Sequence, residues 1–180
     1  MPPATRLSEQ LTLQSFGEIS RFLREGVADE ESRQLRDSLG ALSGQIDEAV
    51  RVRRAGTDTA AILRRVAALA QCAREHQLFL TGLGSAWHAL YEFGAYQRAL
   101  RELSGAIAQW QQALQSRNPA ERASFDQFEL LAWRTLGEAL LLIDMYEHQS
   151  GPASEMPGPA ATGAGRRAGL LQRLLRWLRG

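Results

Sequence analysis

Apolar positions recur every three or four residues along most of the chain, which is the spacing of one face of an α-helix. Glycine, proline or a capping residue separates each such segment from the next. We expect helices over residues 8–25, 30–54, 59–77, 86–114 and 119–148. We find no convincing alternation of the kind that a half-buried strand shows. The pattern predicts an all-α fold, an antiparallel bundle of about five helices.

The apolar stripes of the first three segments predict core residues. They comprise Leu11, Phe16, Ile19 and Leu23, then Leu35, Leu39, Leu42, Ile46 and Ala49, then Ile62, Val66, Leu69, Ala73 and His76. The fifth segment is apolar on most sides near Leu140 to Ile143, so we expect it to be the most buried element.

The fourth segment has the most regular pattern. Its stripe follows a strict three-four spacing through Ala86, Ala89, Phe93, Tyr96, Leu100, Leu103, Ile107, Trp110 and Leu114. Such a heptad seam predicts coiled-coil-like packing against a neighbouring helix. The same seam, from Ala86 to Leu114, could also pair two copies of the chain as a homodimer.

Two helix starts carry capping signals. Asp58 or Thr59 is placed to cap the third helix. Asn118 can cap the fifth, Pro119 suits its first position, and Glu121 can complete a capping box.

Composition divides the chain into a helical domain over residues 1–148, a linker over 149–165 and a tail over 166–180. The linker contains four glycines and three prolines, which predicts disorder. The tail reads RRAGLLQRLLRWLRG and contains no acidic residue. It predicts a short cationic amphipathic helix at the C-terminus.

The tail helix would have an apolar side and a basic side. At about 100° per residue, its leucines and Trp177 fall within an arc of roughly 160°. The predicted binding residues are Arg166, Arg167, Leu170, Leu171, Arg173, Leu174, Leu175, Arg176, Trp177, Leu178 and Arg179. A helix of this kind attaches to an anionic membrane surface or docks in a protein groove. A third alternative is that it folds back on the body as a sixth helix.

Charge is unevenly distributed along the chain. All 21 basic residues are arginine, and the formal net charge is +1. The five tail arginines leave residues 1–165 with +1 − 5 = −4. An acidic body is a poor platform for nucleic acid, so we do not expect a nucleic-acid partner. We see no apolar leader or membrane-spanning segment and expect the chain in the cytoplasm, peripheral to the membrane where its tail binds.

The residues that could carry chemistry form no catalytic or metal motif, and we predict no enzyme, cofactor or metal site. His88 and Glu92, four residues apart on one predicted helix face, are the alternative site for an enzyme, although a surface pair is the simpler interpretation. His76 is expected to be a hydrogen-bonded core or capping residue, and Cys72 to be buried and inert.

Large and basic side chains in the body have structural interpretations too. Three tryptophans, Trp87, Trp110 and Trp133, are expected to anchor the core. A basic cluster comprises Arg51, Arg53, Arg54, Arg64 and Arg65. It is expected to be a solvated face offset by Asp47, Glu48 and Asp58.

Two fragments resemble parts of a tetratricopeptide repeat. The first carries Gly94, Tyr96, Ala99, Leu103 and Ala106, and the second carries Trp133, Leu136 and Gly137. Their phase does not fit a 34-residue period, and the unbroken heptad pattern through Gly94 predicts one helix there and no turn. We therefore assign no family.

These patterns together indicate a non-enzymatic adaptor or chaperone-like interaction protein that its tail recruits reversibly to an anionic membrane. The alternative is a subunit of a complex whose tail docks in a partner's groove.

Overall fold

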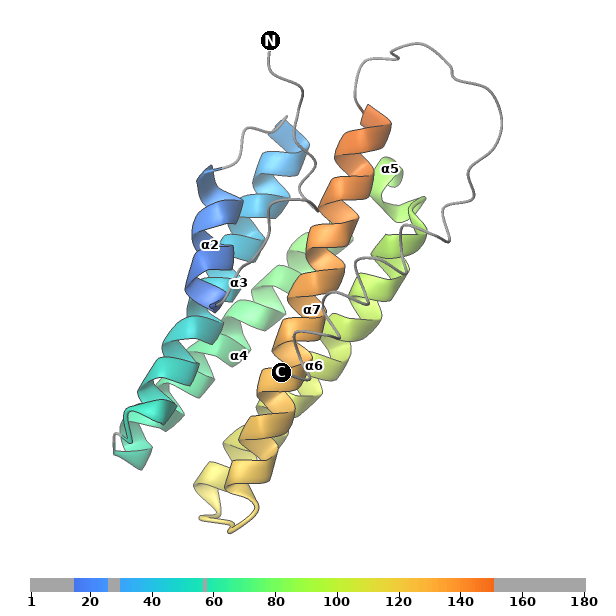
Figure 1. Cartoon of the computed structure of the whole chain (residues 1–180). Coiled ribbons are helices and arrows are strands. Elements are labelled where there is room, and N and C mark those ends of the chain that lie inside the picture. Colours follow the sequence, from blue (N-terminus) through green and yellow to red (C-terminus); the bar gives the residue numbers. More distant parts are fainter. Residues whose placement is uncertain (1–14, 26–29, 57, 151–180) are drawn as a thin grey trace.

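The structure is a computed structural model that describes residues 15–25, 30–56 and 58–150. Within these ranges the chain forms helices and no strand (Figure 1). The helices are α2 (Phe16–Glu25), α3 (Glu30–Arg54), α4 (Thr59–Thr81), α5 (Ser85–His88), α6 (Tyr91–Gln115) and α7 (Glu121–Ser150). Residues 1–14, which include Leu11, and residues 151–180, which include most of the linker and all of the tail, lie outside the described ranges.

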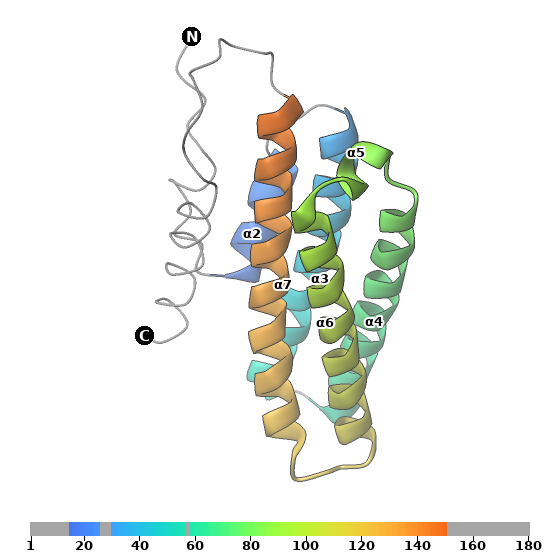
Figure 2. The same ribbon diagram turned by 90° about the vertical axis from the view of Figure 1, so that its right-hand side faces the viewer.

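Four long helices, α3, α4, α6 and α7, form an antiparallel up-and-down bundle (Figures 1 and 2). In it, α3 packs against α4 and α7, and α6 packs against α4 and α7. The shorter α2 lies against the outer side of α3 and runs antiparallel to it. The single turn of α5 lies at one end of the bundle, between α4 and α6. The all-α antiparallel bundle predicted from the sequence is therefore confirmed.

The core consists of the predicted stripes. Phe16, Ile19 and Leu23 of α2 are buried, and the predicted stripes of α3 and α4 are buried throughout. Each fully buried leucine or isoleucine contributes roughly 1.5–3 kcal/mol relative to an exposed one. Because the stripes of different helices meet in one contiguous core, the described residues from Phe16 to Tyr146 form a single packed unit.

The predicted helix over residues 86–114 is wrong in its first turn. The chain leaves the helix at Ala89 and Leu90, where Leu90 is extended with φ −77° and ψ 133°. The break turns Trp87 into the core, fully buried and stacked on Tyr146 with 3.6 Å between ring centroids. In one continuous helix the seam position Ala86 would face inward instead; here Ala86 and Ala89 are exposed.

From Phe93 to Leu114 the seam is buried against the chain's own helices. A homodimer through the seam from Ala86 to Leu114 would therefore have to open the core of each monomer. The helix continues through Gly94, as the heptad pattern predicts, so the turn of a tetratricopeptide repeat does not occur at this position.

Close approach between α2 and α3 depends on glycine. A Cβ at Gly40 would lie 3.1 Å from Cγ of Arg24 and 3.4 Å from the carbonyl oxygen of Ser20. At this contact the Ser20 hydroxyl donates to the Gly40 carbonyl oxygen at 2.7 Å, and the Ser43 hydroxyl donates to the Phe16 carbonyl oxygen at 2.7 Å. The glycine thus allows α2 to pack close enough for side-chain hydroxyls to bond to the opposing backbone.

The helix ends agree with the capping signals in part. Asp58 caps α4 by accepting from the Ala60 amide at 3.2 Å, and Asn118 accepts from the Ala120 amide at 2.9 Å. α4 is longer than expected, because it extends to Thr81, whereas α7 runs from Glu121 to Ser150 and so begins and ends two residues later than predicted. Among the described residues, α2 begins at Phe16, and the Ser15 hydroxyl accepts from the Glu18 amide at 3.2 Å. The predicted start of this helix at residue 8 lies outside the described ranges.

Candidate functional site

The tail residues predicted to bind a membrane or partner, Arg166 to Arg179, lie outside the described residues. The body contains the remaining candidates from the sequence, the histidines, the cysteine and the basic cluster. It also contains an apolar helix face that the sequence did not single out.

His88 and Glu92 do not share one helix face as predicted. The break at Ala89 and Leu90 places His88 at the end of α5, exposed, and Glu92 in the first turn of α6, 4% exposed. The ring of His88 packs against Phe93 with 4.4 Å between centroids. The helical i, i+4 geometry that suggested a pair is thus absent at these two residues.

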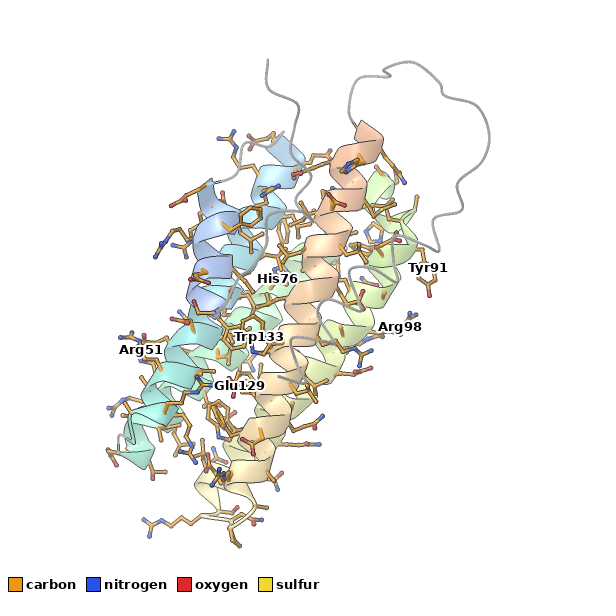
Figure 3. All side chains as sticks on the ribbon, in the orientation of Figure 1. Arg51, His76, Tyr91, Arg98, Glu129 and Trp133 are labelled. Atoms are coloured by element: carbon orange, nitrogen blue, oxygen red, sulfur yellow. The ribbon has the colours of Figure 1, made fainter. Side chains whose placement is uncertain are left out.

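His76 lies inside the bundle, where α3, α4 and α6 meet (Figure 3). Its Nδ1 lies 2.6 Å from the Ser38 hydroxyl and its Nε2 lies 2.6 Å from the Tyr96 hydroxyl. In the neutral ring one nitrogen donates and the other accepts, so both contacts can be hydrogen bonds. Burial lowers the pKa of His76 to about 4 and raises the pKa of Tyr96 well above its usual value. The prediction of a hydrogen-bonded core histidine is confirmed.

Cys72 is half-buried on α4. Burial, with a smaller contribution from the Glu75 carboxylate, raises the pKa of its thiol. Because the thiolate is the nucleophile, this environment makes the cysteine less reactive.

Four of the five arginines in the basic cluster pair with carboxylates from two helices, and Arg53 does so with Glu121 of α7. Arg51 and Arg65 pair with Glu48 of α3, whereas Arg54 pairs with Glu129 of α7. The sequence predicted that Glu48 offsets this cluster, and it does. Asp47 and Asp58, which were expected to do the same, bond to backbone amides instead. Asp47 accepts from the Gly17 amide at 3.0 Å, and Asp58 caps α4.

Glu121 holds three helices together at one end of the bundle. Arg53 of α3 donates to its two oxygens at 2.7 and 2.6 Å, and the indole N–H of Trp110 on α6 donates to it at 2.8 Å. The hydrogen bond from Arg53 lowers the pKa of Glu121. The predicted capping box does not form, because the Asn118 amide donates to the Ala113 carbonyl oxygen at 2.9 Å.

A second ionic cluster ties the other end of α7 to α3. Arg36 is 3% exposed and donates to Glu147 through Nε at 2.9 Å and Nη2 at 2.8 Å. The Ser32 hydroxyl donates to the same carboxylate at 2.6 Å. Tyr146, next to Glu147 on α7, donates to Glu31, the residue before Ser32 on α3, at 2.8 Å. The last two turns of α7 are thus held to the bundle just before the chain continues into the linker.

α7 has two apolar sides, and only one faces the core. Its buried apolar residues are Phe125, Phe128, Ala132, Leu136, Ala139, Leu142, Ile143 and Tyr146. Leu130 lies nine residues before Ala139 and hence on the opposite side, because a helix turns about 100° per residue. Gly137, Leu141 and Met145 lie within about 60° of Leu130 around the helix. We call Leu130, Gly137, Leu141 and Met145 the α7 outer stripe.

The outer stripe corrects the expectation that this helix is the most buried. Leu130 is 46% exposed, and Gly137, Leu141 and Met145 are half-buried. More residues are buried in α6 than in α7. Trp133, at the border of the stripe, is also only half-buried and stacks on Phe16 with 4.1 Å between centroids. Of the three predicted tryptophan anchors, Trp87 and Trp110 are fully buried.

Acidic residues accompany the outer stripe. Asp126 and Asp144 lie within about 40° of Leu130 around the helix, and Glu138 lies about 80° away on the other side. Two arginines share this side of the helix. Arg134 lies about 40° from Leu130 and pairs with Glu102 of α6 at 2.7 Å, and the exposed Arg122 lies about 80° away. The signal for this face was present in the sequence: a helix that is apolar all round has more apolar surface than one core can cover.

Two further findings concern the described residues alone. Among residues 15–25, 30–56 and 58–150, no group of three or more histidine, cysteine or acidic side chains could hold a metal ion. Within the same ranges, no helix combines the length and the apolar character needed to cross a membrane.

Comparison with known proteins identifies no relative. No family model, no curated protein and no solved structure matches this chain.

Proposed function

We propose that this protein is a non-enzymatic helical adaptor that residues 166–180 recruit reversibly to anionic membranes. The observation that carries the proposal is the composition of the tail. Five arginines, five leucines and one tryptophan occur there without an acidic residue. Apolar side chains on one side of a helix enter the boundary between headgroups and acyl chains, while arginines on the other side contact anionic headgroups.

Rough magnitudes favour reversible attachment. Partial burial of five leucines and a tryptophan contributes about 5 kcal/mol, and each arginine near an anionic surface adds up to about 1 kcal/mol. Ordering about ten residues of the tail as a helix costs about 1 kcal/mol per residue, which offsets most of the gain. A weak net affinity of this kind depends on anionic lipid and falls as salt screens the arginines.

The body supplies a rigid unit for the tail to position. Several polar side chains form hydrogen bonds between its helices, as in the contacts of His76 with Ser38 and Tyr96, and of Glu121 with Arg53. These side chains hold helices together, and we assign them no catalytic role. An adaptor needs such a stable scaffold and an exposed surface for a partner.

Vesicle co-sedimentation tests the proposal. The full chain should sediment with vesicles of phosphatidylglycerol and phosphatidylcholine, but not with pure phosphatidylcholine. A chain that ends at Gly165 should remain in the supernatant. Leu174→Glu should reduce binding because it places a charge on the apolar side, whereas Gln172→Glu, on the polar side, is the matched control and should reduce it less.

The outcome also separates membrane from protein binding. If deletion of residues 166–180 leaves sedimentation unchanged, the tail is not the membrane anchor. If the full chain binds no vesicle but Leu174→Glu abolishes co-purification with a protein, the tail docks in a partner's groove and the membrane proposal is wrong.

A further inference from the structure

The α7 outer stripe is an apolar surface that the chain's own core does not cover. It extends from Leu130 to Met145, about 22 Å along the helix at 1.5 Å per residue. Leu130 is exposed and Leu141 and Met145 are half-buried, and apolar side chains gathered on one helix face in this way are candidates for an interaction site. We propose that the stripe is the docking site of residues 166–180 of the same chain, which cover it when no membrane is bound.

The dimensions of the two surfaces agree. A helix of 15 residues is about 22 Å long, the same as the distance from Leu130 to Met145 along α7. The tail's apolar arc, formed by its five leucines and Trp177, can pack lengthwise against the leucines of the stripe. Gly137 lies near the middle of the stripe, where the absence of a side chain allows a second helix to approach closely.

The charges of the two surfaces are complementary. Asp126, Glu138 and Asp144 lie beside the stripe on α7. The tail contains five arginines and no acid, and residues 1–165 have a net charge of −4 by the count above. Arg122 and Arg134 are the arginines on this side of α7, so the acids exceed the arginines by one. Arg134 is paired with Glu102, and Asp144 lies 3.4 Å from His148. Opposite charges on either side of an apolar contact orient the docked segment.

The position of the last described residue determines the direction of docking. α7 ends at Ser150, beyond Met145, and 15 residues separate it from Arg166. A connection of that length rich in glycine and alanine reaches about 21 Å on average. Met145 is about 8 Å from Ser150 along the helix axis, whereas Leu130 is about 30 Å away. The tail should therefore begin near Met145 and end near Leu130, antiparallel to α7.

Docking to α7 and binding to a membrane use the same apolar side of the tail, so they exclude each other. Anionic lipid would draw the tail away and expose the outer stripe to a protein partner. This switch rests on the proposed membrane function, whereas the docked arrangement stands without it. The protein would thus present its partner surface only where anionic lipid is present.

Distance measurements between paired spin labels test the docked arrangement. In a full chain with Cys72→Ser, we place one label at Gln127→Cys, exposed on α7, and the other at Gly180→Cys or at Ala168→Cys. Without lipid, both pairs should give narrow distance distributions. The pair at 127 and 168 should be longer by about 18 Å, the rise of 12 helical residues. Broad distributions for both pairs, or the reverse order of distances, would overturn the proposal.

Substitutions test whether the stripe itself is the docking site. Leu141→Glu should broaden the short distance between labels at 127 and 180. Gln109→Glu, which adds the same charge to an exposed position of α6, should leave it unchanged. Equal effects of the two variants would contradict docking on the stripe. The distances in the chain without either substitution remain decisive if Leu141→Glu disturbs the fold. If instead a label at Ala4→Cys approaches position 127 while the tail labels do not, residues 1–14 cover the stripe and the proposal is wrong.

Vesicles separate the docked arrangement from the membrane function. Addition of mixed phosphatidylglycerol and phosphatidylcholine vesicles should lengthen and broaden the distance between labels at 127 and 180. If the labels show docking but the chain does not sediment with these vesicles, docking stands and the membrane function is wrong. If the chain sediments with the vesicles but the labels show no docking without them, the membrane function stands and the docked arrangement is wrong.

Discussion

α6 and α7 lie side by side in the bundle, but they differ in what holds them and in what they present outward. α6 is joined to α4 by neutral groups, through the hydrogen bond between Tyr96 and His76. α7 is joined to α3 by charged groups near both ends, through Glu121 with Arg53 and Glu147 with Arg36. Neutral and charged contacts respond differently to substitution and to pH, so the two helices can be distinguished by experiment.

The outward faces differ as well. α6 exposes Tyr91 at its first residue, and along the rest of its length it exposes Arg98, Arg101, Glu102, Gln109 and Gln112; Figure 3 shows Arg98 projecting from the bundle. α7 exposes Leu130 and its neighbours in the outer stripe. The difference indicates that α6 meets solvent on its outer side, while α7 has an outer side suited to a further helix.

The largest effect should come from breaking a charged contact of α7. Glu147→Ala leaves Arg36 buried without its partner, and we expect this to lower the free energy of unfolding by about 3–5 kcal/mol. Urea denaturation measures the change. Combining Arg36→Met with Glu147→Leu should recover most of the loss, because two apolar side chains need no counter-charge. A loss below about 1 kcal/mol for Glu147→Ala would show that the pair does not secure α7.

Acid should weaken the neutral contact of α6 before it affects the charged contacts. The pKa of His76 is about 4 in the folded state, below its ordinary value of 6.5, so the unfolded chain binds the extra proton first. Stability should therefore fall as the pH decreases from 6.5 toward 4, by roughly 3 kcal/mol in total. Glu121, whose pKa is lowered, loses its contribution only as the pH falls below its ordinary value of 4.5.

Urea denaturation at several pH values between 6.5 and 4.5 isolates the contribution of His76. His88→Gln is the matched control, because it removes the imidazole of an exposed histidine by the same substitution. His76→Gln should flatten the dependence, even if it lowers stability at every pH. A slope that persists in His76→Gln would assign the acid sensitivity to another group.

The sequence predicts features set by neighbouring residues better than features set by distant ones. The predicted range 30–54 coincides with α3, and Asn118 caps α7 as expected. Contacts between distant residues override local signals elsewhere. Trp87 stacks on Tyr146, which lies 59 residues later in the chain. This contact is made at the break in the helix before α6. Glu121 bonds to Arg53, 68 residues away, in place of the local capping box.

The candidate surface was harder to predict than the core. The apolar residues from Leu140 to Ile143 indicate burial on most sides, but the pattern does not say which side meets the core. Only the packing of α7 against α3 and α6 shows that Leu142 and Ile143 face inward, while Leu141 lies in the outer stripe. The tail is recognised by composition alone, and the proposal of a docking site for it required the position of α7 in the bundle.

The contact between α6 and α7 at Trp110 should have an intermediate effect. Trp110→Phe removes the N–H donor to Glu121 and leaves a small void in a fully buried site. We expect a loss of about 1–2 kcal/mol in the free energy of unfolding. Trp133→Phe is the matched comparison, because Trp133 is only half-buried and a phenylalanine can still stack on Phe16. Equal losses for the two variants would show that the Glu121 contact adds little to packing.

The smallest effect should come from the outer stripe. Leu130 is 46% exposed, so Leu130→Ala should change the stability of a chain ending at Gly165 by less than about 0.5 kcal/mol. Leu136→Ala, on the inner side of the same helix and 1% exposed, should cost about 2–5 kcal/mol. If the tail docks on the stripe, Leu130→Ala should cost more in the full chain than in the shortened one, because the leucine then loses contacts with the tail. Equal small losses in both chains would leave the stripe exposed in the full-length protein and remove the reason for its apolar character.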